Sequence, residues 1–191
     1  MTSMSETIYI CLDVEASGPI PDPYNLVSIG AVPVEQKSET WQVRSDDLFY
    51  VELKPLYAGF DAEAMAIHGI SREHLEQHGM PAAQAMKKLS NWSTSRGGRP
   101  IFVGHNAVFD WAYVNHYYVR TGVANPFGWK ALDTKALAAG VLRIPFLETH
   151  KENLASLLPG MQPEDLSQKH RADYDALYQA EILVALLNYS G

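Results

Sequence analysis

The sequence predicts an α/β fold in which a mixed five-stranded sheet is flanked by helices. Three strand-like segments follow one another in the N-terminal third, and strands then alternate with helices to the end of the chain. Hydrophobic residues make up 47% and charged residues 19% of the 191 positions. That composition supports a buried core and excludes a disordered or coiled-coil chain. Neighbouring strands pair antiparallel, whereas strands joined through a helix run parallel, so the sheet is expected to be mixed.

The N-terminal third is predicted to form three strands. Ile8–Val14 alternates in side-chain character and is rich in β-branched residues, which is typical of a strand. Leu26–Val34 and Leu48–Leu53 have similar character. A proline-rich loop, Gly18–Asn25, separates the first two strands. These segments are close enough in sequence to pair in succession.

Helices are predicted to follow the third strand. Asp61–Ile67 and Ser71–His78 are expected to be short. A longer helix begins at Pro81, because proline suits the first helical turn. The loop Ser93–Pro100 contains two glycines and ends that helix.

The second half of the chain alternates between strands and helices. Ile101–Gly104 is predicted to be a short buried strand and Ala107–Thr121 a helix, which Gly122 would close as a C-cap. Lys130–Leu132 has room for a fifth strand, and further helices are expected after it. The final helix is predicted over Ala172–Tyr189.

We expect residues 1–191 to form one domain, since the length suits one domain and the sequence contains no long linker. A formal charge of −7 argues against a protein that coats duplex nucleic acid through a broad basic face, but it allows a local nucleic-acid site.

The single cysteine, Cys11, cannot form an internal disulfide, which suits a reducing, cytoplasmic location. The start is unlike a secretory signal, and Ile182–Leu187 is too short to span a bilayer, so no membrane partner is expected.

Two carboxylates are predicted to lie side by side at the end of the first strand. Asp13 and Glu15 are two residues apart, and side chains two apart on a strand point to the same face. Tyr9 and Cys11 share that face, so it is not simply exposed to solvent. A lone pair of this kind is more often a loop cap beside a solvated acid, and it needs support from elsewhere in the chain.

Asp110 provides part of that support. It lies in the first turn of the predicted helix at 107–121, and Tyr113, Val114 and Tyr117 follow it at the spacing of a buried stripe. Stabilisation by the helix dipole is an equally good explanation for an acid at this position. A buried carboxylate nevertheless needs a partner, because an unpaired buried charge is costly.

His170 and Asp175 flank the start of the final helix. Asp175 is next to the inward stripe of that helix, and His170 lies just before it. Asp173 is the rival acid, but its position is well explained by helix capping. Taken alone, His170 would more often be an ordinary surface imidazole.

The four acids point to metal chemistry if the fold brings them together. Two carboxylates 4 Å apart repel by about 4 kcal/mol at an effective dielectric of roughly 20. Divalent cations with hard oxygen ligands, such as Mg²⁺ and Mn²⁺, relieve that repulsion. Two such ions can clamp the attacking and leaving oxygens of a phosphoryl displacement, and a neighbouring imidazole can take a proton from water.

Three ordered motifs resemble one known family. DVEASG at 13–18, GHNAVFD at 104–110 and HRADYDA at 170–176 are similar to the exonuclease motifs of the DEDD superfamily, in its histidine-containing branch. That branch includes proofreading exonucleases, ribonuclease T and oligoribonuclease. AIHGI at 66–70 and LDT at 132–134 also resemble family segments, in the right order.

The resemblance implies a ribonuclease H-like fold and a metal-dependent 3′–5′ exonuclease that uses two divalent cations, Mg²⁺ or Mn²⁺. Asp13, Glu15 and Asp175 would hold one metal, Asp13 would bridge to a second at Asp110, and His170 would be the general base. The implied substrate is the 3′ end of a single strand or a short oligonucleotide. The residues implied to cradle the terminal nucleotide are Ala16, Ile67, His68, Asn106 and Phe109.

One departure from the family pattern concerns the terminal base. Pro19 stands where relatives often have an apolar residue that wedges against that base, so the prolines at 19–23 are expected to reshape this side of the pocket. The alternative function is a non-catalytic domain that binds nucleic-acid ends or a protein, and the presence of all five catalytic residue types argues against it. The sequence does not decide whether the substrate is DNA or RNA. It also does not decide whether the chain forms a homodimer or works with a polymerase or another protein partner.

Overall fold

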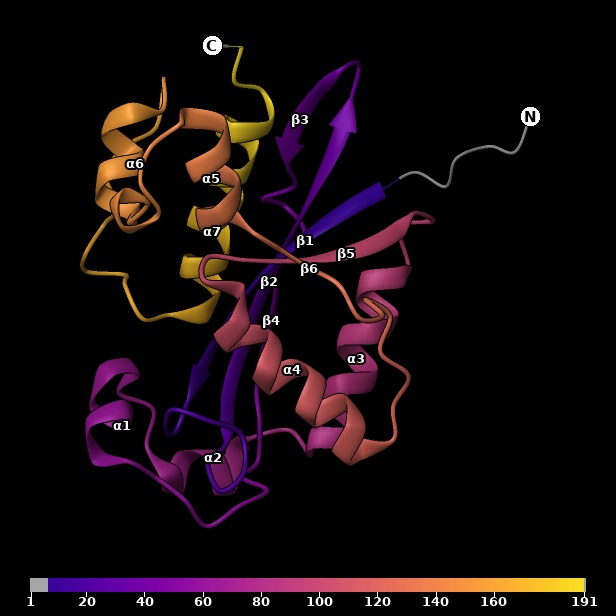
Figure 1. Cartoon of the computed structure of the whole chain (residues 1–191). Helices are drawn as coiled ribbons and strands as arrows, with labels where there is room; N and C mark the ends of the chain where they lie inside the picture. Colours follow the sequence, from indigo (N-terminus) through magenta and orange to yellow (C-terminus); the bar gives the residue numbers. More distant parts are fainter. Residues whose placement is uncertain (1–6, 191) are drawn as a thin grey trace.

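A computed structural model describes residues 7–190, and a twisted mixed sheet runs through its centre (Figure 1). Within these residues the sheet has six strands in the order β3-β2-β1-β5-β6, with β4 also paired to β2. The strands are β1 (Thr7–Ala16), β2 (Leu26–Lys37), β3 (Thr40–Val43), β4 (Phe49–Glu52), β5 (Arg99–Gly104) and β6 (Ala131–Asp133). The mixed α/β architecture predicted from the sequence is confirmed.

The number of strands corrects the expectation of five. β2 continues beyond the predicted end at Val34 to Lys37 and turns back at once into β3. Ser38 and Glu39 make that turn with φ of 49° and 70°, the left-handed conformation that suits a tight hairpin. β3 pairs with the distal end of β2, and β4 pairs with Ser28–Ala31 nearer its start. Neither turn residue is a glycine, so the sequence carried no strong hairpin signal here.

Helices cover both faces of the sheet. α3 and α4 pack on one face, in a cluster that includes Ile8, Ile10 and Leu12 of β1. α7 packs on the other face against Cys11, and α5 and α6 lie against α7 (Figure 1). The helices are α1 (Ala62–His68), α2 (Arg72–His78), α3 (Ala82–Thr94), α4 (Ala107–Thr121), α5 (Thr134–Leu142), α6 (Lys151–Leu157) and α7 (Ala172–Leu187), with a 3₁₀ turn at Phe146–Glu148. The prediction that neither face of the first strand is solvated is confirmed.

A close approach between β2 and α7 fixes where α7 begins. Gly30 pairs with Asp13 across the two strands. A Cβ atom at Gly30 would lie 2.0 Å from the carbonyl oxygen of Ala172, at the start of α7. Only glycine permits this contact, which brings the first turn of α7 onto the sheet beside Asp13.

The strands in the parallel part of the sheet all end at one edge. β1 pairs parallel with β5, and β5 pairs parallel with β6, so their carboxyl ends lie at the same edge. Ligands of open α/β sheets characteristically bind outside these carboxyl ends. Among residues 7–190, no helix has the length and apolar character needed to cross a membrane.

Candidate active site

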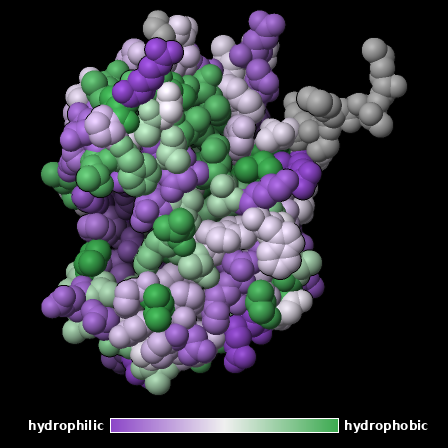
Figure 2. Space-filling model, in the orientation of Figure 1, coloured by the Kyte–Doolittle hydropathy of each residue, from purple (hydrophilic) through white to green (hydrophobic). Residues whose placement is uncertain are grey.

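Four carboxylates from three separated segments converge at this edge of the sheet. Asp13 and Glu15 come from the end of β1, Asp110 from the first turn of α4, and Asp175 from the first turn of α7. They line one hollow with a volume of about 260 Å³. A hydrophilic recess is visible between α1 and the segment before α7, at the left of Figure 2. The hollow is lined by Asp13, Val14, Glu15, His105, Asn106, Phe109, Asp110, Lys151, Lys169, His170, Asp175 and Gln179.

Three of the acids are close enough to share a metal ion. One carboxylate oxygen from each of Asp13, Glu15 and Asp175 lies within 4.8 Å of the other two. Carboxylate oxygens are the ligands that Mg²⁺ and Mn²⁺ prefer. The donor set therefore fits a hard divalent cation.

Asp110 lies beside this trio and is only 5% exposed. Its Oδ1 accepts a hydrogen bond of 3.0 Å from the backbone N–H of Val14, which ties the start of α4 to the end of β1. The bond leaves lone pairs on both carboxylate oxygens for a second ion or its water.

Burial and mutual repulsion disfavour the ionised carboxylates. Desolvation raises the pKa of Asp13 well above its ordinary value, and the charges of Asp110, Asp175 and Glu15 add to the rise. The pKa of Glu15 rises to about 8, mainly through desolvation and then through repulsion by Asp175 and Asp110. Desolvation also raises the pKa of Asp110 to about 7. Such a cluster gains most from a bound cation, which favours the ionised forms.

Lys151 supplies a cation that the sequence analysis missed. Its Nζ donates to Asp175 Oδ1 and, over 2.8 Å, to Glu164 Oε1. The side chain of Glu164 is only 1% exposed, and its Oε2 has no hydrogen-bond partner within the described residues. The charge of Lys151 lowers the pKa values of Asp13, Glu15 and Asp110, against the larger effect of burial.

Gln179 and His105 complete the wall of the hollow. Gln179 Nε2 donates to Asp13 Oδ1 over 2.5 Å, while its Oε1 accepts from the backbone N–H of His105 over 2.9 Å. His105 Nδ1 lies 2.8 Å from Thr134 Oγ1. Gln179 follows Asp175 by four positions on α7, and this helical spacing is the signal that could have identified it. Lys151 had no such signal, because its partners lie 13 and 24 residues away along the chain.

His170 adopts a left-handed backbone conformation, with φ of 65°. Its backbone N–H donates to Asp175 Oδ2 over 2.8 Å, so the carboxylate holds the residue that bears the imidazole. The side chain of His170 is exposed and lines the carboxylate hollow. The rival acid Asp173 pairs with Arg171 over 2.9 Å and is not among the residues that line the hollow.

A second hollow of about 560 Å³ adjoins the first. Its lining includes Ala16, Ile67 and Phe109, three of the residues implied to cradle a terminal nucleotide, together with Pro19 from the proline-rich loop. Asn106 and Phe109 line the carboxylate hollow.

Asn106 and His68 are placed by local backbone structure. Asn106 stands at the start of α4 with φ of 69°, and its side chain makes no cap hydrogen bond. His68 lines neither hollow. Its Nδ1 accepts from the N–H of Ile70 over 3.1 Å, and burial lowers its pKa. All the sequence-predicted site residues except His68 therefore line one or both of the two hollows.

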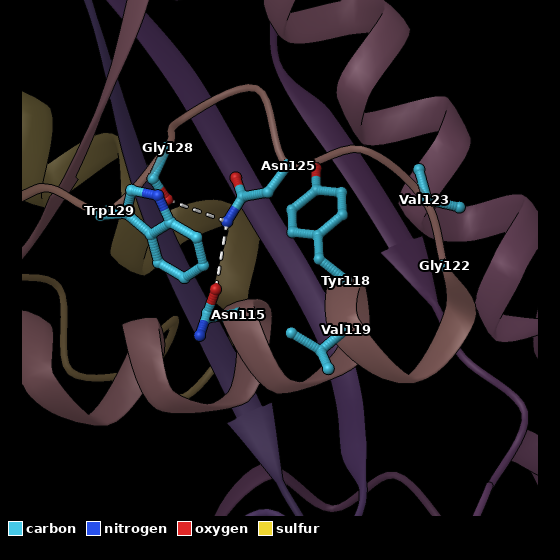
Figure 3. Close-up of a pocket in the computed structure, with 8 residues that line it drawn as sticks. All are labelled: Asn115, Tyr118, Val119, Gly122, Val123, Asn125, Gly128 and Trp129. Atoms are coloured by element: carbon cyan, nitrogen blue, oxygen red, sulfur yellow. Dashed lines mark hydrogen bonds between the residues drawn. The ribbon is translucent and has the colours of Figure 1, made fainter.

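A third hollow, of about 350 Å³, lies at the C-terminal end of α4 (Figure 3). Asn125 Nδ2 bridges Asn115 Oδ1 and the carbonyl oxygen of Gly128 beside Trp129. No carboxylate or histidine is among the residues that line it, so it offers no group for acid–base or metal chemistry.

Known proteins resemble the chain over nearly its whole length. The exonuclease family profile matches residues 10–183. The 3′-5′ DNA exonuclease Cap18 of Escherichia coli is 35% identical, over 92% of this chain and 89% of that protein. Ribonuclease T of Yersinia pseudotuberculosis is 31% identical, over 94% of this chain and 84% of that protein.

Solved structures share the fold. The nuclease domain of 3′hExo, a DEDDh family member bound to rAMP, has a TM-score of 0.76 at 14% identity and covers 97% of this chain and 93% of that one. E. coli exonuclease I in complex with a dA16 oligonucleotide has a TM-score of 0.71 at 19% identity, over 94% of this chain and 40% of that one. These neighbours confirm the ribonuclease H-like fold.

Proposed function

The chain belongs to the DEDDh exonuclease family, and from that premise we propose that it releases nucleoside 5′-monophosphates from the 3′ ends of single-stranded nucleic acid. The observation that carries the proposal is the convergence of Asp13, Glu15 and Asp175, with ligand atoms within 4.8 Å, beside His170 and an adjoining hollow. The proposed metal ligands, the imidazole proposed as general base and the hollow proposed to hold a nucleotide thus lie together.

The four acids fit two divalent cations, Mg²⁺ or Mn²⁺. In the proposal, Asp13, Glu15 and Asp175 would hold one ion, and Asp110 together with Asp13 would hold the second. When bound, the two ions supply an activated water and neutralise the charge on the leaving 3′-oxygen. The raised pKa values of Glu15 and Asp110 support this assignment, because the acids are arranged so that a cation relieves their repulsion.

His170 is proposed as the general base. It takes a proton from the water that attacks the terminal phosphodiester, and the bond from phosphorus to the 3′-oxygen of the penultimate nucleotide breaks. The products are a nucleoside 5′-monophosphate and a strand shortened by one nucleotide. Its exposed side chain lines both hollows, so it can reach the reacting phosphate while Asp175 holds its backbone.

The terminal nucleotide is proposed to occupy the larger hollow. Phe109 can stack on any base, which gives grip without sequence preference. Ala16 and Ile67 provide apolar walls, and Gly18 and Pro19 also line the hollow. His68 stays among the residues proposed to contact the nucleotide because it lies near His170. Burial lowers the pKa of His68, and the charge of His170 lowers it further. Asn106 is proposed to contact the nucleotide from the carboxylate side.

Single-stranded DNA is the substrate that we propose first. The relative named as a DNA exonuclease is 35% identical to the chain, against 31% for a ribonuclease T. RNA remains the comparison substrate, because both kinds of relative span nearly the whole chain.

We propose that residues 1–191 act as one domain, since the helices that carry the acids pack on a single sheet. A cytoplasmic location is part of the proposal, because Cys11 is a free, fully buried thiol. A homodimer, or a complex with a polymerase or another protein, remains a prediction.

The test is digestion of single-stranded oligonucleotides with Mn²⁺ or Mg²⁺, with the label at the 5′ end to follow shortening from the 3′ end. Asp13→Ala and Asp175→Ala are expected to abolish digestion while the circular dichroism spectrum of the fold survives. Asp173→Asn is the matched control, because Asp173 is on the same turn of α7 as Asp175 but pairs with Arg171. Near-normal digestion by Asp13→Ala and Asp175→Ala would contradict the metal assignment, and binding without turnover in the unaltered chain would favour the non-catalytic alternative.

A further inference from the structure

The two hollows define a direction for the bound strand. Both are lined by Glu15, Phe109 and His170. The larger continues toward α1, while His105 and Lys151 line only the carboxylate hollow. If the terminal nucleotide lies in the larger hollow, as proposed above, the remainder of the strand leaves past His105 and Lys151.

The order of the β-strands shows which residues lie beyond His105 and Lys151. β5 lies between β1 and β6, and all three run parallel. The carboxylates follow the end of β1, His105 follows the end of β5, and Lys135 follows the end of β6. A single-stranded nucleic acid that runs along this edge of the sheet, away from α1, would therefore pass His105 first and Lys135 next.

His105, Lys135 and Phe146 lie close to one another. His105 Nδ1 lies 2.8 Å from Thr134 Oγ1, and Lys135 is the next residue. Lys135 Nζ lies 5.5 Å from the ring centroid of Phe146, which is 49% exposed. Burial, and then the charges of Lys151 and Lys135, lower the pKa of His105 to about 4, against the opposing charge of Asp133.

The nearest acid in sequence, Asp133, opposes part of this positive charge, but it forms no side-chain ion pair with Lys135. The carboxylate of Asp133 accepts hydrogen bonds from the backbone N–H groups of Ala107, Lys135 and Ala136, over 2.7–3.2 Å. Its oxygens are thus engaged by the starts of α4 and α5. Lys135 pairs with no carboxylate in the part of the chain that the structure describes.

We propose that Lys135 and Phe146 form an upstream subsite for single-stranded nucleic acid, in which Phe146 stacks on a base and Lys135 binds a backbone phosphate. An aromatic face beside a cation is the combination that binds single strands without reading their sequence. This inference rests on the proposed exonuclease function and adds the path of the strand to it. The protein, although its formal charge is −7, would then bind single-stranded nucleic acid at one edge of its sheet.

The test compares a substrate too short to reach the subsite with one that spans it. Phe146→Ala and Lys135→Met are assayed on a dinucleotide and on a dodecanucleotide of single-stranded DNA. Loss of the stacking contact is expected to raise KM for the dodecanucleotide about 5- to 100-fold. The kcat/KM for the dinucleotide is expected to stay at the level of the unaltered chain.

Salt dependence isolates the phosphate contact. The dissociation constant of a 5′-labelled dodecanucleotide is measured in EDTA at a series of salt concentrations. Lys135→Met is expected to reduce the slope of log K against log salt by about 0.7, the contribution of one phosphate on a single strand. Lys88→Met is the matched control, because Lys88 Nζ also lies 5.5 Å from an aromatic centroid, that of Phe49, but belongs to α3.

Three outcomes would overturn the subsite. One is an equal loss on both substrates, and another is an unchanged KM for the dodecanucleotide in both variants. The third is unchanged DNA binding accompanied by a change in solution mass, which would make Phe146 and the exposed Leu147 a protein interface. Failure of the unaltered chain to digest either substrate would instead contradict the proposed function itself.

Discussion

The ammonium of Lys151 donates to the carboxylate of Asp175, and it joins two helices across the candidate metal site. The same ammonium is held by Glu164, whose side chain is almost fully buried. The proposed metal ligand Asp175 therefore has a positively charged neighbour within the protein. The ion pair stabilises the site, and it also competes with any cation for the same carboxylate.

Lys151→Met is expected to lower the melting temperature in EDTA by about 6–20 °C. Removing one partner of a buried ion pair costs about 3–5 kcal/mol, and each kcal/mol is worth about 2–4 °C in a chain of this size. Mn²⁺ is expected to raise the melting temperature more in this variant than in the unaltered chain, because the ammonium no longer competes for Asp175. Thermal unfolding followed by circular dichroism, with and without Mn²⁺, measures both effects.

The control for Lys151 is Arg44→Met. Arg44 pairs with Glu35 over 2.8 Å, but its side chain is 44% exposed. Exposed pairs contribute little, so the melting temperature should change by no more than about 4 °C. A smaller response to Mn²⁺ in Lys151→Met than in the unaltered chain would show that Lys151 supports the metal site rather than competing with it.

Glu15→Gln is expected to stabilise the chain at high pH in EDTA. The pKa of Glu15 in the folded chain is about 8, above its ordinary 4.5, so between these values the folded state keeps a proton that the unfolded state releases. Stability from this group is complete below pH 4.5 and is lost as the pH rises through 8. Glutamine stays neutral, so the difference in melting temperature should be small at pH 5 and about 10–20 °C in favour of the variant at pH 9. A difference that does not vary with pH would contradict the raised pKa.

His170→Ala is expected to reduce kcat by about 10²- to 10⁴-fold, the usual contribution of a general base. The stabilisation by Mn²⁺ should be retained, because the three acids whose ligand atoms lie within 4.8 Å do not include His170. Melting curves and initial rates on one oligonucleotide separate the two effects. Loss of the response to Mn²⁺ together with the activity would mean that His170 is needed to form the metal site.

Gly30→Ala is expected to lower both stability and activity. The new Cβ would lie 2.0 Å from the carbonyl oxygen of Ala172, so the start of α7 must shift and carry Asp175 with it. Gly140→Ala is the control, since no atom lies within 4 Å of a Cβ at that helical position and alanine should stabilise the helix by about 0.5–1 kcal/mol. Normal activity in Gly30→Ala would show that the contact does not position Asp175.

Local sequence patterns were sufficient for most elements and for the principal acids. α4 spans Ala107–Thr121 as predicted, and Gly122 follows it with φ of 69°, because helical periodicity and a glycine cap are written in neighbouring residues. Asp175 was preferred over Asp173 because it lies next to the inward stripe of α7, and the structure places it in the hollow. The ordered motifs added the exonuclease resemblance, which the comparisons confirm.

Only the tertiary structure decided how the acids are surrounded. The pairing of Lys151 with Glu164 and Asp175 depends on the course of the segment before α7, which no local period encodes. The hairpin of β2 and β3 likewise turns on two residues that are not glycines. Sequence determines which residues share a face of one element, because that follows from the period of a helix or strand. Contacts between elements depend on how the chain packs, and so the cation beside the carboxylates became visible only in the fold.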